Sequence, residues 1–593
     1  ICPNLADVGP ARSVGSHGGL GLFSLLLDQP KQIAFLSDAG GSSQQQLYTA
    51  DVSTGIVRRL TNLTGFLSSP AWSPDGHSLA FLFIENAPRA AGPLQPMTPP
   101  SGEIEKHIYE QRLNVVDAAG GSPRAVSPSD MYVYEYDWAP DGKSFATIAA
   151  QGDGDNNWWI AQLYSLGLDG RMTSLYKPKF QIANPRFSPD GRTIAFIEGL
   201  MSDQGATGGD VYTIASTGSA VRNLTPGMPA SATWLEWSGP QNIQFTQVVD
   251  GNSGVATVDT NGQLTQIWNG PELITAGSWD ISLSLARDGR QSAVIRSSAQ
   301  RPPEVWAGAI GGWAQMTREN GDVHPLWGEQ RSLHWKSDNL RVQGWLLFPR
   351  DYDASKRYPL IVNVHGGPAS ACTATWPGQL DAPLAAMGYF VLCPNPRGSF
   401  GRGAAFTQGN VKDFGGGDLR DIMAGVDQVL REVPVDANRL GIQGWSYGGY
   451  MTMWAETQTN RFRAAFAGAG IANWLSYYGQ NDIDQWLIPY FGASVYDDPA
   501  VYNRSQPISF VKNVKTPTLI VVGDRDGECP APQSFEWWHA LKTFKIPVKF
   551  VVYPDEGHMI QQPQHRRDIT LRSVEWFDQW LKAGAQPHAA AAR

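Results

Sequence analysis

Charged residues are scarce in this chain of 593 residues. They make up 17% of it, against about 25% in an average soluble protein. The 46 basic residues form no block or stripe and are outnumbered by 55 acidic ones, which argues against a nucleic-acid partner. Long apolar runs are also missing: the run at residues 20–27 is far shorter than the roughly 18 residues that a membrane-spanning helix needs, so we expect no membrane span.

Cysteine is rare as well. The chain has four, Cys2, Cys372, Cys393 and Cys529, and no pair has the CxxC spacing. This set is too sparse for a disulfide scaffold and lacks the spacing of a zinc site, so we expect buried structural thiols, no metal and no cofactor. The first residue is Ile1 instead of Met, which favours a periplasmic or secreted mature chain over a cytoplasmic one. A homo-oligomer is left open.

Glycine, proline and tryptophan are abundant, with 63, 41 and 22 copies. Because disordered chains contain few aromatic residues, this composition indicates a well-packed protein rich in turns. The length allows between two and five domains of about 100–200 residues each.

One phrase recurs in the N-terminal half: an aromatic or apolar residue, a polar turn that usually contains Asp-Gly, and a short apolar strand. Its copies begin at Trp72, Trp138, Phe187, Trp237 and Leu285. The first step is 66 residues and the next are 49, 50 and 48. The long first step contains a stretch rich in Pro, Ala and Gly, residues 87–101, which we interpret as an inserted loop. The apolar run at 33–35 indicates one further unit before these.

A period near 48 residues is typical of a four-stranded propeller blade. The turns fit this interpretation, because Pro fixes φ and Gly takes a positive φ in a tight turn. We therefore predict an all-β propeller over residues 1–330. It has six blades, or seven if another lies within residues 1–30 or 305–317. A β-sandwich with similar turns is the alternative.

From about residue 335 the pattern changes to alternating strands and helices. Strands are predicted at 360–364, 389–392, 440–443, 518–522 and 548–552, and helices at 419–430, 450–458 and 564–582. Asp418 is placed to cap the first of these helices. Such alternation predicts a mostly parallel sheet covered on both faces, an α/β-hydrolase domain over residues 331–593.

The motif that carries chemistry is Gly-Trp-Ser-Tyr-Gly-Gly at residues 444–449, a G-x-S-x-G elbow between a predicted strand and a predicted helix. A serine hydroxyl is a poor nucleophile, so Ser446 needs a base that an acid orients. Asp526 and His558 each follow one of the last two predicted strands, in the chain order that such a triad requires. Asp524 is the alternative to Asp526 as the acid.

A developing oxyanion needs two donors. We expect one to be the backbone N–H of Tyr447, directly after the nucleophile. The other is expected from the His-Gly-Gly-Pro loop at 365–368, with the N–H of Gly367 favoured, because two residues without Cβ let the backbone approach a substrate. A plain Gly-Pro turn is the alternative.

The elbow, the His-Gly-Gly-Pro loop, the Asn-Pro-Arg-Gly-Ser segment at 395–399 and the upstream repeats together resemble the prolyl oligopeptidase family of serine peptidases over nearly the whole chain. The loop is more similar to the acylaminoacyl-peptidase and dipeptidyl-peptidase branches. The resemblance implies a propeller that caps the active site and restricts it to short peptides. By position it also implies an apolar S1 pocket formed by Ile471, Trp474 and Tyr477, with aromatic core packing as the alternative.

The chain departs from this family at two places. Members that grip a free amino terminus use adjacent glutamates in the propeller, whereas this chain has no Glu-Glu pair, and Glu103 with Glu105 is a weak substitute. Two residues after the acid, where Arg or Asn often holds a substrate carbonyl, this chain has Glu528. A carboxylate cannot donate to a carbonyl but can pair with an α-ammonium. We hypothesise that Glu528 favours substrates with a free amino terminus; a structural role is the alternative.

The sequence thus predicts a serine peptidase of the aminopeptidase, dipeptidyl-peptidase or acylaminoacyl-peptidase type. An esterase or amidase acting on small acyl compounds is the first alternative, since the same triad attacks any acyl carbon. A propeller binding protein with an inert hydrolase domain is the second.

Overall fold

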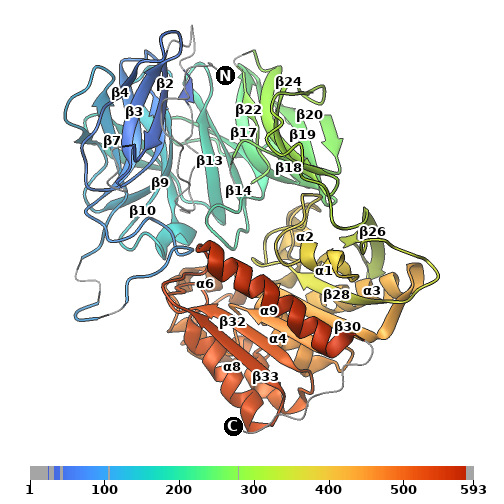
Figure 1. The fold of residues 1–593 in the computed structure, drawn as a ribbon. Helices are drawn as coiled ribbons and strands as arrows, with labels where there is room; N and C mark the ends of the chain where they lie inside the picture. The colour runs from blue at the N-terminus through green and yellow to red at the C-terminus, as the bar shows by residue number, and fades with distance from the viewer. Residues whose placement is uncertain are drawn as a thin grey trace.

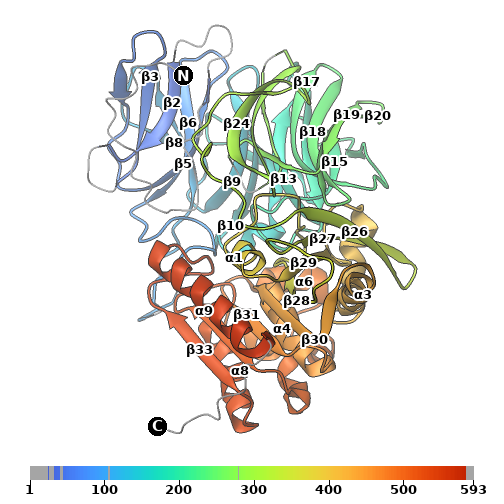
Figure 2. The ribbon, with the colours of Figure 1, turned by 45° about the vertical axis from the view of Figure 1, so that its right-hand side comes forward.

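The computed structural model describes residues 24–25, 32–39, 44–99, 101–104, 107–277, 280–286 and 288–582. Within these ranges, the strands up to residue 315 form six β-sheets, and those from residue 330 onward form an eight-stranded sheet that is flanked by helices. Figure 1 shows the propeller above the α/β domain, and Figure 2 shows the same stacking after rotation.

In the first five propeller sheets the paired strands are neighbours in the sequence, which is the topology of a blade, and in the sixth both β21 and β22 pair with β23. In blade order the strands are β1 (Ser24–Leu25), β2 (Gln32–Ser37), β3 (Gln46–Asp51), β4 (Val57–Arg59); β5 (Gly65–Trp72), β6 (Ser78–Glu85), β7 (Arg112–Asp117), β8 (Arg124–Ala125); β9 (Met131–Trp138), β10 (Ser144–Gln151), β11 (Gln162–Gly167), β12 (Met172–Tyr176); β13 (Gln181–Phe187), β14 (Thr193–Gly199), β15 (Asp210–Ala215), β16 (Arg222–Asn223); β17 (Ser231–Gly239), β18 (Asn242–Val249), β19 (Asn252–Asp259), β20 (Leu264–Gly270); and β21 (Leu273–Thr275), β22 (Ser284–Leu285), β23 (Gln291–Ser298), β24 (Arg301–Ala309), β25 (Ala314–Gln315).

The recurring phrase of the sequence lies at the same place in the second to fifth blades, where its turn joins the first strand to the second and its apolar run forms β6, β10, β14 or β18. In the first and sixth blades the apolar run forms β2 and β23. The Asp side chain closes the turn: the Asp75 carboxylate accepts hydrogen bonds from the Ser73 hydroxyl (2.6 Å) and the His77 N–H (3.0 Å). Gly76 follows Asp75 at φ +72°, a value that a residue with Cβ rarely adopts.

Within the described residues the propeller has six blades. Residues 305–317, one of the two places considered for a seventh blade, belong to β24 and β25 of the sixth sheet. The first 23 residues lie outside the described ranges.

The α/β sheet has the strand order β26-β27-β29-β28-β30-β31-β32-β33. Its strands are β26 (Gln330–Ser337), β27 (Leu340–Leu347), β28 (Tyr358–Val364), β29 (Phe390–Asn395), β30 (Val435–Trp445), β31 (Ala464–Gly468), β32 (Thr518–Gly523) and β33 (Val548–Tyr553). Pairing is parallel from β29 to β33, and β26 and β27 add an antiparallel edge. All six residues of β32 are buried, as expected for a strand covered on both faces.

The helices cover both faces of this sheet. They are α1 (Ala382–Ala386), α2 (Ala404–Thr407), α3 (Gly417–Glu432), α4 (Tyr447–Gln458), α5 (Trp474–Tyr478), α6 (Leu487–Phe491), α7 (Pro499–Asn503), α8 (Ala531–Thr543) and α9 (Pro563–Leu581). Alternate residues of β28 point to opposite faces: Ile361 packs with α1 and α9, whereas Leu360 and Val362 pack with α3 and α4. Figure 1 shows α9 crossing the sheet on the side nearer the viewer. In the described residues no helix is both long and apolar enough to span a membrane.

Two details of the sequence prediction are wrong. Asp418 does not cap a helix, because α3 begins at Gly417 with Gly416 as its N-cap. Asp418 instead lies buried in the first turn and accepts hydrogen bonds from its neighbour Leu419 and from the hydroxyl of Tyr447. The boundary between residues 330 and 331 stays a prediction.

The cysteines are the second error. Cys372 and Cys393 form a disulfide, and only Cys529 is a free buried thiol in the described part of the chain. The two partners are 21 residues apart, and the fold brings them together because the loop after β28 returns over β29, where the Asn395 side chain holds the backbone of Cys372 on both sides.

Replacing both cysteines, Cys372→Ser with Cys393→Ser, is expected to lower the free energy of unfolding by about 3 kcal/mol, because the cross-link restricts the unfolded chain. Urea denaturation measures this change, with the wild type under a reductant as a control that shows the same loss. A non-reducing digest should contain the peptide that joins these residues. An unchanged stability and no such peptide would contradict the disulfide.

Candidate functional site

Ser446 lies on a sharp turn between β30 and α4. Its backbone has φ +62° and ψ −125°, outside the regions that residues with a side chain prefer. Such strain persists where the surroundings impose it, and it is frequent at functional sites. The Ser446 N–H donates to the Gly468 carbonyl of the neighbouring strand β31 (3.0 Å), which fixes the turn to the end of the sheet.

Two flanking glycines make this turn sterically feasible. A Cβ on Gly448 would lie 2.0 Å from the carbonyl oxygen of Val364, and one on Gly444 would lie 2.4 Å from the backbone of Gly448. Real Cβ atoms do not come so close, so the elbow requires glycine at both positions.

His558 and Asp526 face each other after the last two strands. The Nδ1 of His558 lies 2.9 and 3.0 Å from the two carboxylate oxygens of Asp526, to which it can donate. One of these oxygens also accepts the N–H groups of Glu528 (3.0 Å) and Cys529 (2.7 Å). Asp524, the alternative acid, is exposed, and only its backbone N–H is bonded, to the Tyr553 carbonyl (3.0 Å).

Glu528 faces the other nitrogen of the same imidazole. Its Oε2 lies 3.2 Å from His558 Nε2, and both side chains are about 5% exposed or less. Burial raises the pKa of Glu528 to about 8. Burial alone would lower the pKa of His558, but the carboxylates of Asp526 and Glu528 outweigh it and raise that pKa to about 9. The imidazole is therefore held between two carboxylates.

The hydroxyl of Ser446 points elsewhere. Among the described residues no hydrogen bond joins Ser446 to His558. The hydroxyl interacts instead with the thiol of Cys529, whose pKa is raised by burial and by the nearby carboxylates and lowered by this contact. In this structure Ser446 lies beside Cys529, and His558 lies beside Glu528, but Ser446 and His558 are not hydrogen-bonded to each other.

The His-Gly-Gly-Pro loop passes beside the serine. A Cβ on Gly366 would lie 3.2 Å from the Cβ of Ser446, and Gly367 has φ +114°. The side chain of His365 holds the loop through Ser399 (2.9 Å between Nε2 and Oγ). The N–H of Ala369 donates to the hydroxyl of Ser202, a propeller residue (3.1 Å).

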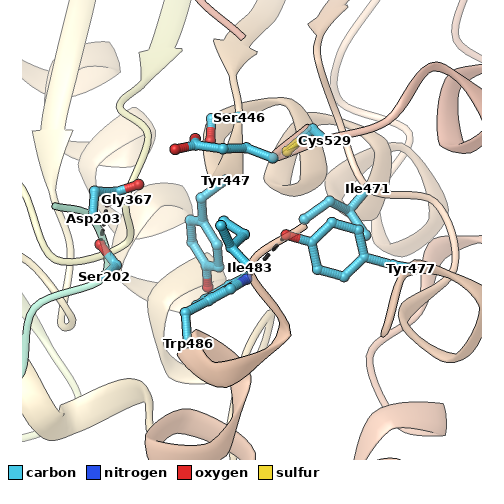
Figure 3. A pocket seen from close by; sticks show the side chains of 11 residues that line it. Ser202, Asp203, Gly367, Ser446, Tyr447, Ile471, Tyr477, Ile483, Trp486 and Cys529 are labelled. Carbon is cyan, nitrogen blue, oxygen red and sulfur yellow. Dashed lines mark hydrogen bonds between the residues drawn. The ribbon is translucent and has the colours of Figure 1, made fainter. Parts of the chain in front are cut away.

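A small cavity, with volume of about 10 Å³, opens at this point between the two domains. Its lining consists of Ser202, Asp203, Gly367, Ser446, Tyr447, Ile471, Tyr477, Ile483, Trp486, Glu528 and Cys529. Figure 3 shows Ser202 and Asp203 entering from one side, and the hydrogen bond from the Trp486 indole to the Tyr477 hydroxyl (3.0 Å) on the other.

Most of the residues predicted for the site meet here. Ser446, Tyr447, Gly367, Ile471, Tyr477 and Glu528 line the cavity, and His558 with Asp526 lies behind Glu528. Trp474 is fully buried behind the lining, where its ring packs on Tyr450 (4.8 Å between centroids) and Tyr477 (5.5 Å). Glu103 is exposed and Glu105 lies outside the described residues.

The sequence analysis missed Ser202 and Asp203. They follow β14 in the fourth blade, and no motif distinguishes them from an ordinary blade loop. The one available signal is the length of the loop between β14 and β15. This loop has 10 residues, Leu200 to Gly209, whereas a tight β-hairpin loop has two.

The inserted loop of the second blade, residues 87–101, was predicted, but its contacts with the α/β domain were not. Its backbone bonds to both loops that carry the Asp-His pair: Met97 N–H donates to the Arg525 carbonyl (2.9 Å), and the Leu94 carbonyl accepts from Met559 (3.3 Å). Gly527 and Gly557 have no room for a Cβ against this insertion. The propeller thus supports the positions of Asp526 and His558.

Comparisons with known proteins agree with this architecture. Residues 380–584 match the model of the prolyl oligopeptidase family. The chain is 28% identical to the uncharacterized peptidase YuxL of Bacillus subtilis, over 93% of this chain and 89% of that one. It is 27% identical to dipeptidyl-peptidase 5 of Porphyromonas gingivalis, over 76% and 67%. The solved acylaminoacyl peptidase of Pyrococcus horikoshii has the same fold, with a TM-score of 0.77 at 22% identity, over 95% of this chain and 88% of that one.

The geometry predicts the charge of His558. Because two carboxylates stabilise the imidazolium, we expect its proton to be retained as the pH rises past 6.5 and to be lost only near pH 9. A pH titration of ¹⁵N-histidine-labelled protein by NMR measures this. Glu528→Gln removes one carboxylate and should lower the midpoint. A wild-type midpoint at or below 6.5 would contradict the arrangement.

Proposed function

The chain belongs to the prolyl oligopeptidase family through residues 380–584, and from this premise we propose that it hydrolyses short peptides through an acyl-enzyme formed on Ser446. The observation that carries the proposal is that the strained serine elbow lines a cavity whose Glu528 wall contacts a buried His-Asp pair. Serine peptidases combine these parts in this chain order on this type of sheet.

The roles follow from the atoms. His558 Nε2 accepts the proton of the Ser446 hydroxyl as Oγ attacks the substrate carbonyl, while Asp526 holds the opposite nitrogen protonated and fixes the ring. The N–H groups of Tyr447 and Gly367 stabilise the oxyanion. His558 then gives the proton to the leaving amine, and a water molecule releases the acyl group by the reverse sequence.

The propeller supports a limit on substrate size. Its loop at Ser202 and Asp203 forms one wall of the cavity, and its insertion at residues 94–97 lies against the loops of Asp526 and His558. A folded protein could not place its backbone between these walls, whereas a short peptide end could. Ile471 and Tyr477 supply an apolar surface for a modest side chain at the position before the cleaved bond.

Glu528 supports recognition of a free amino terminus. Its buried carboxylate lines the cavity, and among the described residues no arginine or lysine pairs with it. Its cationic neighbour is the imidazole of His558, which must lose its proton to act as the base. A substrate ammonium would then pair with the carboxylate, whereas an N-acetyl group would leave it buried without a cation, which costs several kcal/mol.

A fluorophosphonate probe tests this proposal. The wild type should be labelled at Ser446, because an activated serine reacts with the phosphorus centre, and Ser446→Ala should not be labelled. Labelled enzyme should lose hydrolysis of aminoacyl, dipeptidyl and acylaminoacyl p-nitroanilides together. Absence of labelling in folded wild type together with no Ser446-dependent hydrolysis of any substrate would support an inert binding protein, and labelling with hydrolysis of esters but of no peptide substrate would support an esterase.

A further inference from the structure

Both nitrogens of the His558 ring face carboxylates. Nδ1 contacts Asp526 at 2.9 Å, and Nε2, the atom that must accept the serine proton, contacts Glu528 at 3.2 Å. At this distance the Glu528 carboxylate forms an ion pair with a protonated Nε2 and so favours a proton on that nitrogen. A protonated Nε2 has no lone pair to offer. While this pair persists, Nε2 cannot accept a proton from Ser446.

The cavity also contains a second carboxylate. Asp203 reaches it from the propeller, held by a hydrogen bond from Ser202 (2.5 Å), and burial raises its pKa. In the described residues neither Asp203 nor Glu528 has a lysine or arginine within ion-pairing distance. The other titratable groups that act on this cluster are Asp526 and Cys529 of the acid loop, Asp155 of the propeller, Asp482, Tyr477 of α5 and Tyr490 of α6. The cluster is therefore rich in acidic groups, and its one cationic group in the described residues is the imidazole of His558.

We propose that the substrate's own ammonium group binds between Glu528 and Asp203 and draws Glu528 away from His558 Nε2, so that binding of the correct substrate switches on the general base. This inference rests on the proposed function and adds that Glu528 inhibits the empty enzyme. One proton balances the step: the proton shared by Nε2 and Glu528 passes to solvent, Glu528 remains ionised against the ammonium, and the Nε2 lone pair becomes available to Ser446.

The geometry also selects where the ammonium lies on the substrate. The reacting carbonyl must approach Ser446, and Glu528 contacts the same imidazole nitrogen that serves Ser446. A substrate amino group can contact Glu528 while the carbonyl lies at Ser446 only if it is close to the reacting carbon. The α-amino group of the acyl residue fits, because its nitrogen is two bonds from that carbon. The substrate class is therefore aminoacyl amides and peptides cleaved after their first residue.

The test compares alanine p-nitroanilide with its N-acetyl form on the wild type and on Glu528→Gln and Glu528→Ala. For the free amine, kcat/KM should fall about 100-fold, because the cation loses a buried partner. For the acetylated substrate it should rise, because the base is no longer blocked. The acid limb of its pH profile, which reports the pKa of His558 in the free enzyme, should move down by about one unit.

Two further variants separate the roles. Asp203→Asn should slow the free amine but should not accelerate the acetylated substrate, because Asp203 is not the carboxylate at Nε2. Asp524→Asn, which changes an exposed acid in the same loop, is the matched control and should change kcat/KM for neither substrate.

If both Glu528 variants change kcat/KM for the two substrates in the same direction, or if the acid limb does not move, the inference is wrong. If alanyl-alanine p-nitroanilide is cleaved faster to release the dipeptide than alanine p-nitroanilide is cleaved, the aminoacyl assignment is wrong. If the wild type shows no Ser446-dependent hydrolysis of any substrate, the proposed function itself fails.

Discussion

The contact between His558 and its two carboxylates is the interaction on which the rest of this site depends. Asp526 and Glu528 belong to one loop, and two consecutive N–H groups of that loop, those of Glu528 and Cys529, hold the Asp526 carboxylate. The loop therefore fixes the acid and at the same time presents Glu528 to the far side of the imidazole. A buried imidazole in this setting is stable as a cation, and in the proposed mechanism Glu528 moves away from Nε2 while Asp526 stays on Nδ1.

The two domains share the site. The α/β sheet supplies the elbow, the acid loop and the His-Gly-Gly-Pro loop, all at the carboxyl ends of parallel strands, which is where open α/β sheets bind ligands. The propeller supplies Ser202 and Asp203 as one wall and residues 94–97 as a support for the loops of Asp526 and His558. A change in how the domains pack would alter the walls of the cavity and the positions of the acid and the base together.

The sequence alone predicted the features that local rules govern. The Pro-Asp-Gly turns mark the blades because their glycines must take positive φ, and the elbow is recognisable because Gly444 and Gly448 leave no room for a side chain. The predicted strands 518–522 and 548–552 each end one residue before the observed strands do, whereas the predicted strand 440–443 covers only part of β30. The short strand Ala464–Gly468 was missed because its alanines and glycine have little strand preference, and only burial between β30 and β32 makes it a strand.

Features that depend on long-range contacts were not predictable in this way. Cys372 and Cys393 pair because the loop after β28 folds back over β29, and Asp418 meets Tyr447 because α3 and α4 begin on the same face of the sheet. Asp203 is 325 residues away from Glu528 in the sequence, and nothing near it distinguishes it from a surface acid. The contact between Glu528 and His558 Nε2 could not be predicted from the sequence either. The sequence showed only that Glu528 stands where related peptidases often have Arg or Asn.

The most direct test of the account compares Asp526→Asn with Asp524→Asn, two isosteric changes in one loop. The amide introduced by Asp526→Asn could not hold the imidazole in the required tautomer, so kcat/KM on a free-amine p-nitroanilide should fall by about 10³–10⁴-fold. The exposed Asp524 does not contact the site, so its variant should retain the wild-type value within about twofold, in line with other surface changes. Equal activity of both variants, or a loss confined to Asp524→Asn, would contradict the assignment of His558 and Asp526 as the catalytic pair.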